Sequence, residues 1–279
     1  MALLSLAAQW IDSTFTLQKA VLHAKSFRGS HTGEATAAAT EEMLKAWNIE
    51  KSKVHVILRD NASNVVKAMD RLGVASLGCF AHNLQLVVNK GLLAQRSVSD
   101  AVSVGRKIVG HFKHSPLAYS RLEDIQVELN MPSKRLQQDV RTRWNSTYYM
   151  IQSLLAQKRV LCAYAAEYDL PATLTANQWG LLEKTVTALA PFEELTMEVS
   201  SASASDVILI VCVLKRALRR EDPADEGAKT MKTTLFEAVD RRFSAVESEP
   251  LYSVATLLDP RYKDRFFTSA ETSGCGKRH

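Results

Sequence analysis

The spacing of hydrophobic positions divides the sequence into a shorter part with strand and helix patterns and a longer part with helical patterns alone. In the first part, apolar alternation predicts a β-hairpin that turns at Asp12–Ser13, and Met43, Leu44 and Trp47 lie at helical spacing. The predicted order is strand, strand, helix, strand, helix and short strand, at residues 3–12, 16–25, 35–47, 53–59, 60–72 and 75–79. This order predicts a small α/β unit.

The pattern changes between residues 80 and 90, and the rest of the chain reads as helical. The predicted helices lie at residues 82–94, 98–113, 116–130, 133–139, 145–168, 175–200, 204–220 and 228–247. A charged linker is predicted at 221–229. The fold class expected from the pattern is therefore α/β followed by mostly α.

Composition adds limits to this picture. The 279 residues are 46% hydrophobic and 23% charged, which is typical of a globular protein and excludes a wholly disordered chain. A net charge of +5 is compatible with nucleic-acid binding but does not by itself indicate it. Four cysteines without a Cys-x-x-Cys pair indicate a reducing compartment. No apolar run reaches the roughly 20 residues of a membrane helix, so no membrane partner is expected.

Two local patterns could carry metal chemistry, and each has a structural alternative. Asp60 follows a predicted strand and opens a helix, so its carboxylate could be a metal ligand, or Asp60 or Asn61 could cap the helix. Cys79 and His82 lie three residues apart, but zinc needs about four ligands and no second pair has suitable spacing. A buried cysteine beside a hydrogen-bonded histidine is the preferred interpretation, and no zinc is expected.

Basic residues concentrate in the middle of the chain. Between Arg106 and Arg143 there are eight Lys or Arg and four acidic residues. These cations could contact phosphates without reading base sequence, or they could belong to solvated helix faces. The candidate nucleic-acid-binding residues are Arg106, Lys107, Lys113, Lys134, Arg135, Arg141 and Arg143. A second basic cluster comprises Lys215, Arg216, Arg219 and Arg220.

The dipeptide Arg143–Trp144 allows two interpretations. Both side chains could stack or hydrogen-bond at a nucleic acid. Alternatively, Asn145 or Ser146 could cap a helix while Trp144 packs its entry turn.

Five motifs in a fixed order together resemble the hAT transposase superfamily, and most closely the zinc finger BED domain-containing proteins. They are SHTGE, DNASN, CFAHNLQLVVN, TRWNSTYYM and LDPRYK, at residues 30–34, 60–64, 79–89, 142–150 and 258–263. The resemblance implies a ribonuclease-H-like core interrupted by a long all-helical insertion. It implies a partial core over residues 1–90, the insertion over 91–250, and a return segment with a disordered tail over 251–279.

Active members of the superfamily cut DNA with three acidic residues that hold two divalent metals. By resemblance, Asp60 matches the second acid, Cys79 and His82 match the Cys-x-x-His motif, and Arg143 with Trp144 matches the Arg-Trp motif. The strand expected to carry the first acid is not found, and Asp12 is not its equivalent. The last acid is not found after LDPRYK either, where Glu271 is a poor match. The usual dimerisation segment and a BED finger are also not found.

The resemblance implies a transposase-derived nuclear protein, and these departures predict that it is catalytically inactive and has no cofactor. Mg²⁺ would bind only if other acids completed a site at Asp60. The expected partner is DNA, bound weakly, non-specifically and in a salt-dependent manner, with a homodimer or a partner protein also possible. An active DNA transposase or nuclease and a helical interaction scaffold without a nucleic-acid role are the alternatives.

Overall fold

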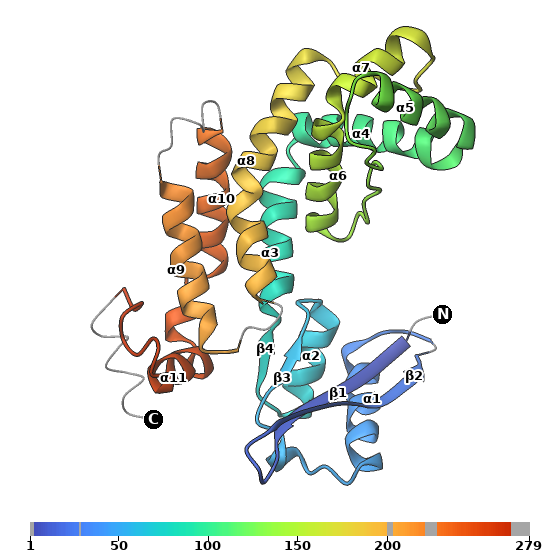
Figure 1. Ribbon diagram of the computed structural model, residues 1–279. Helices are drawn as coiled ribbons and strands as arrows, with labels where there is room; N and C mark the ends of the chain where they lie inside the picture. Colours follow the sequence, from blue (N-terminus) through green and yellow to red (C-terminus); the bar gives the residue numbers. More distant parts are fainter. Residues whose placement is uncertain (1–2, 28, 200–202, 221–227, 269–279) are drawn as a thin grey trace. The chain divides into compact units, whose positions relative to one another are not determined.

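The computed structural model describes residues 3–27, 29–199, 203–220 and 228–268, and the chain forms two compact units, Met1–Asn83 and Leu84–His279 (Figure 1). The boundary falls where the helical pattern begins. No helix among the described residues is long and apolar enough to cross a membrane. The three-part division at residues 90 and 250 stays a prediction.

The first unit opens with the predicted hairpin. Strands β1 (Leu3–Ile11) and β2 (Leu17–Ser26) pair antiparallel, with a register shift between Leu6 and Ala7. Asp12 closes the turn because its Oδ1 atom accepts the backbone N–H groups of Thr14 and Thr16, at 2.9 and 3.0 Å. The local sequence therefore sets this hairpin, and its prediction is confirmed.

A second, parallel sheet pairs β3 (Ile57–Arg59) with β4 (Ser76–Gly78). The predicted strand at 53–59 is shorter in the structure because Lys51–Lys53 form a 3₁₀ turn. Helices α1 (Gly33–Ala46) and α2 (Ser63–Leu72) pack together over a core of Ala37, Leu44, Ala68, Met69, Leu72 and Val74. Side chains from both sheets, including Leu6 and Ile57, cover this core.

The second unit is helical. After α3 (Phe80–Val88) and a π-helical turn η2 (Asn89–Leu93), its helices are α4 (Arg96–His114), α5 (Pro116–Glu128), α6 (Trp144–Ala156), α7 (Lys158–Glu167), α8 (Ala176–Val199), α9 (Asp206–Arg219), α10 (Lys229–Arg242) and α11 (Pro250–Leu258), with a 3₁₀ turn η4 at Val246–Ser248. Helix α8 contacts α4 and α6 as well as α9 and α10, so it joins the two groups of helices that Figure 1 shows.

Three helix predictions need correction. Residues 133–139 are irregular rather than helical, because side chains from α5 and α6 bind their backbone in place of helical hydrogen bonds. The predicted helix 145–168 is two helices that break at Gln157, whose buried amide donates to the carbonyl of Pro132 at 3.3 Å. Helix α11 was not predicted; it begins with Pro250, and Glu249 caps it through the N–H of Leu251.

Candidate functional site

The motifs SHTGE and DNASN meet at the start of α1 and α2. Thr32 caps α1 by accepting the N–H of Ala35 at 3.2 Å, and Asn64 donates to the carbonyl of His31 at 2.9 Å. A Cβ at Gly33 would lie 2.9 Å from the Cβ of Lys67, so glycine allows the two helices to approach this closely. Both motifs thus have structural roles here.

Asp60 lies exposed after β3 at the end of the parallel sheet. Its Oδ1 atom accepts the N–H of Ala62 at 3.0 Å. The expected cap by Asp60 or Asn61 is wrong, since Ala62 is the N-cap of α2 and no side chain caps that helix. Asn61 instead donates to Asn83 at 2.8 Å, and a Cβ at Gly78 would lie 2.6 Å from its Oδ1.

Cys79 and His82 lie at the start of α3, both half-buried. The N–H of Cys79 bonds to the carbonyl of Arg59 at 2.6 Å and so ties this turn to β3. In the described ranges, no group of three or more His, Cys, Asp or Glu is placed to hold a metal ion. The described side chains around Asp60 therefore do not fit a two-metal centre, which needs several carboxylate ligands. Glu271 lies outside the described residues.

Trp144 joins two of the sequence motifs. Its backbone N–H donates to Oε1 of Gln85, which belongs to CFAHNLQLVVN, at 3.0 Å. The indole is buried, with edge-to-face contacts to Tyr148 and Phe192 at centroid distances of 6.2 and 6.1 Å. This placement gives Trp144 a core role and leaves its ring no open face for a nucleic acid.

The N-cap of α6 is Arg143, whose side chain is exposed. The expected cap by Asn145 or Ser146 is wrong. Ser146 instead accepts the N–H of Val140 at 2.8 Å, and Asn145 accepts the N–H of Ser146 at 3.0 Å. In the Arg-Trp dipeptide, Arg143 therefore lies at the surface and Trp144 in the core.

The half-buried Arg106 forms an ion pair with the buried carboxylate of Asp139. Its Nε and Nη2 atoms lie 2.8 and 2.7 Å from the carboxylate, whose side chain is only 1% exposed, and Thr147 donates to the same oxygen. Burial raises the pKa of Asp139, but the hydrogen bonds from Arg106 and Thr147 outweigh it and hold the pKa below its usual value. The guanidinium of Arg106 is thus held by a buried carboxylate.

The remaining candidate cations lie on α4 and on the segment 131–143, which we call the connecting segment. Asp139 is the only acidic residue of that segment, and Arg106 neutralises it. The cations Lys107, Lys113, Lys134, Arg135, Arg141 and Arg143 are all exposed. Within the described part of the chain, none of these six forms an ion pair.

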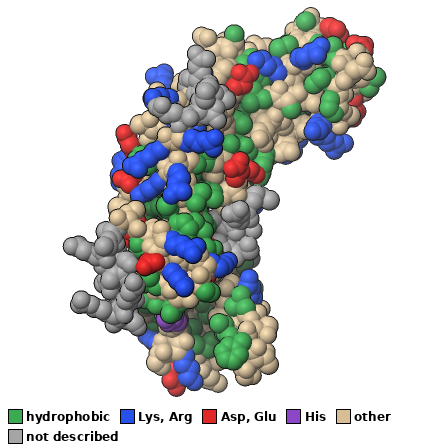
Figure 2. Space-filling model, turned by 60° about the vertical axis from the view of Figure 1, so that its left-hand side comes forward, with side chains coloured by type: hydrophobic (Ala, Val, Ile, Leu, Met, Phe, Trp, Pro, Cys, Tyr) green, Lys and Arg blue, Asp and Glu red, His purple; other side chains and the backbone are tan. Residues whose placement is uncertain are grey.

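The second basic cluster lies on α9. Figure 2 shows several Lys and Arg side chains on the side of the molecule that carries α9 and α10. Lys215 pairs with Asp240 at 2.7 Å, and Arg219 lies over the Phe236 ring at 4.3 Å. Two of its four cations therefore contribute to packing between α9 and α10, which makes this cluster a weaker candidate for phosphate contacts.

Side chains of the LDPRYK motif bind Asp206, the first residue of α9. Tyr262 donates to Asp206 at 2.6 Å, while Arg261 approaches Asp206 and Asp259 at 3.4 and 2.7 Å. Hydrogen bonds from Arg261 lower the pKa of Asp259. Ser205 donates to Asp259 at 2.9 Å. This motif, too, has a structural role.

Comparison with known proteins places these features in a family context. A family model described as the ZBED1 RNase-like domain matches residues 1–78, and one described as the ZBED1 RNase-like helical domain matches residues 77–188. Zinc finger BED domain-containing protein 4 of Homo sapiens is 30% identical over 279 residues, which covers 96% of this chain and 24% of that protein.

Two further relatives are another BED zinc finger protein and a transposase. Zinc finger BED domain-containing protein 6 of Homo sapiens is 32% identical over 75% of this chain and 22% of its own length. The Putative AC transposase of Zea mays is 28% identical over 91% of this chain and 34% of its own length. The chain thus spans about a fifth to a third of the length of these three relatives.

Proposed function

Because the chain belongs to the hAT transposase-derived proteins of the BED zinc finger type, we propose that it is a catalytically inactive, DNA-associated nuclear protein. In this proposal its RNase-like part with the helical region acts as a scaffold. The exposed cations of α4 and the connecting segment contact the phosphates of duplex DNA.

The observation that carries this proposal is the charge of the connecting segment. Lys134, Arg135, Arg141 and Arg143 remain there after Arg106 has neutralised Asp139, and they lie exposed. The same ion pair holds this segment against α4, where Lys107 follows Arg106. Clustered cations without acidic partners favour a polyanion and carry no information about base sequence.

Binding to a random-sequence duplex is expected to weaken about 100-fold between about 50 and about 200 mM salt, if about four phosphates are neutralised. Fluorescence anisotropy at both salt concentrations would measure this. A variant with Lys107, Lys134, Arg141 and Arg143 changed to Gln is expected to lose most of the affinity and most of the salt dependence.

A matched control removes the same number and type of charges elsewhere. Lys90, Lys184, Arg159 and Arg96 are exposed, and their change to Gln is expected to alter the affinity far less. Binding that is independent of salt, or equal loss in both variants, would contradict the phosphate contacts. No mobility shift at low salt would favour the alternative of a protein-interaction scaffold.

Catalytic inactivity is supported by the surroundings of Asp60, which has no group of acidic partners among the described residues. We expect supercoiled plasmid to remain intact with Mg²⁺ or Mn²⁺, and Asp60→Asn to leave DNA binding unchanged. Gel analysis of the plasmid tests this expectation. A metal-dependent nick that Asp60→Asn abolishes would instead establish the alternative of an active nuclease.

A further inference from the structure

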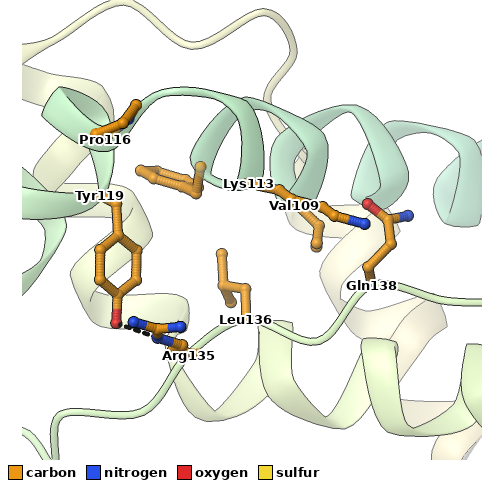
Figure 3. A pocket seen from close by; sticks show the side chains of 8 residues that line it. Val109, Lys113, Pro116, Tyr119, Arg135, Leu136 and Gln138 are labelled. Carbon is orange, nitrogen blue, oxygen red and sulfur yellow. Dashed lines mark hydrogen bonds between the residues drawn. The ribbon is translucent and has the colours of Figure 1, made fainter.

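A pocket of about 420 Å³ opens between the end of α4, the start of α5 and the connecting segment (Figure 3). Apolar side chains supply half of its lining: Val109, Phe112, Pro116 and Leu136. Leu136 points from the connecting segment into the space beneath the helices. The other lining residues are Lys113, Tyr119, Arg135 and Gln138.

The charged residues that line the pocket, Lys113 and Arg135, are both positive. Nε of Arg135 donates to the hydroxyl of Tyr119 at 3.1 Å, which fixes the guanidinium over the tyrosine ring, 5.0 Å from its centroid. Its two terminal nitrogens make no hydrogen bond within the described residues, and neither does the Lys113 ammonium. No acidic side chain lines the pocket. A carboxylate is the complementary ligand group.

The rings of the pocket argue against a nucleotide base. Arg135 already covers one face of Tyr119, and Phe112 is only 4% exposed. Recognition of an unstacked base depends on open aromatic faces, which these two rings offer sparingly. An aliphatic side chain needs no such face, because it gains stability simply by leaving water among Val109, Pro116 and Leu136.

The pocket is held open by the protein itself. Gln126 donates to the carbonyl of Lys134 at 3.0 Å, and Ser153 accepts the N–H of Gln137 at 3.0 Å. These bonds fix the backbone on both sides of Arg135 and Leu136. A preformed site avoids much of the ordering cost of binding.

We propose that this pocket binds an acidic segment of a partner protein. One large aliphatic side chain of that segment occupies the apolar floor, and flanking Asp or Glu side chains pair with Lys113 and Arg135. This inference does not depend on DNA binding, because it rests on the apolar floor as well as on charge.

The test uses the full chain and a fluorescein-labelled peptide with a central leucine between runs of glutamate. We expect saturable binding by anisotropy, and at least about tenfold weaker binding when serine replaces the leucine, since the serine side chain cannot fill the apolar floor. The double variant Lys113→Gln with Arg135→Gln is expected to weaken binding by a similar factor.

The matched control is Lys107→Gln with Arg141→Gln, which removes the same charges outside the pocket. It should leave peptide affinity within about twofold while weakening duplex binding, so the two hypotheses fail separately. Absence of peptide binding, equal affinity for the serine peptide, or equal loss in both double variants would overturn the proposal. Circular dichroism checks that each variant is folded.

Discussion

Asp139→Ala is expected to lower the free energy of unfolding by about 3 kcal/mol, because it strands a guanidinium that the fold has largely removed from water. The Arg106 side chain is 24% exposed, and Asp139 is its ion-pair partner within the described residues. Thr147 would lose its acceptor as well. Urea unfolding followed by circular dichroism gives the value directly.

A double-mutant cycle separates the ion pair from its surroundings. Replacing both partners, with Arg106→Met and Asp139→Leu, is expected to cost far less than Asp139→Ala alone, since no charge is left unpaired. A loss below about 1 kcal/mol in Asp139→Ala would show that Arg106 is free to turn to solvent, and would restore it as a candidate DNA contact.

The same pair predicts a pH dependence. The folded pKa of Asp139 lies below its unfolded value of roughly 3.9, so its contribution is present above that pH and is lost as the pH falls through the folded pKa. The stability difference between wild type and Asp139→Ala should therefore shrink in acid. A constant difference from neutral pH into strong acid would contradict the assignment.

Trp144→Ala is expected to destabilise the protein by about 3–5 kcal/mol, the range for removing a large buried aromatic side chain. The indole is 3% exposed and packs between Tyr148 and Phe192, so its loss leaves a cavity where α6 meets α8. Chemical denaturation measures the effect.

The neighbouring residue is the natural control. Arg143 is exposed, and Arg143→Gln should change stability by no more than about 0.5 kcal/mol while weakening duplex binding. The two residues of the Arg-Trp motif would then have different roles: Trp144 would contribute to stability and Arg143 to DNA affinity. A Trp144→Ala protein of normal stability that no longer binds DNA would reverse this assignment.

Elements stabilised by neighbouring residues could be predicted from sequence. The β1–β2 hairpin follows from apolar alternation and from a turn in which Asp12 accepts the N–H groups of Thr14 and Thr16. Helix α1 follows from periodic apolar residues after the capping Thr32. In both cases the stabilising bond lies within a few residues, where a local pattern can reveal it.

The connecting segment could not be predicted because its partners are distant in sequence. Gln157 reaches the carbonyl of Pro132, 25 residues earlier, and Arg106 pairs with Asp139, 33 residues later. Nothing in the residues 133–139 themselves indicates these bonds, so their composition suggests a helix. The sequence likewise marked Arg106 as a cation but held no signal that Asp139 would pair with it.

The contacts of Tyr262 and Arg261 with Asp206 at the start of α9 also bear on when this part of the protein can fold during synthesis. Tyr262 and Arg261 leave the ribosome after Asp206, separated from it by 56 and 55 residues. At typical translation rates of about 5–20 residues per second, several seconds pass between the synthesis of Asp206 and that of Arg261 and Tyr262. During that interval Asp206 has neither its tyrosine nor its arginine partner, so this end of the helical unit is completed only after residues 261 and 262 have been made.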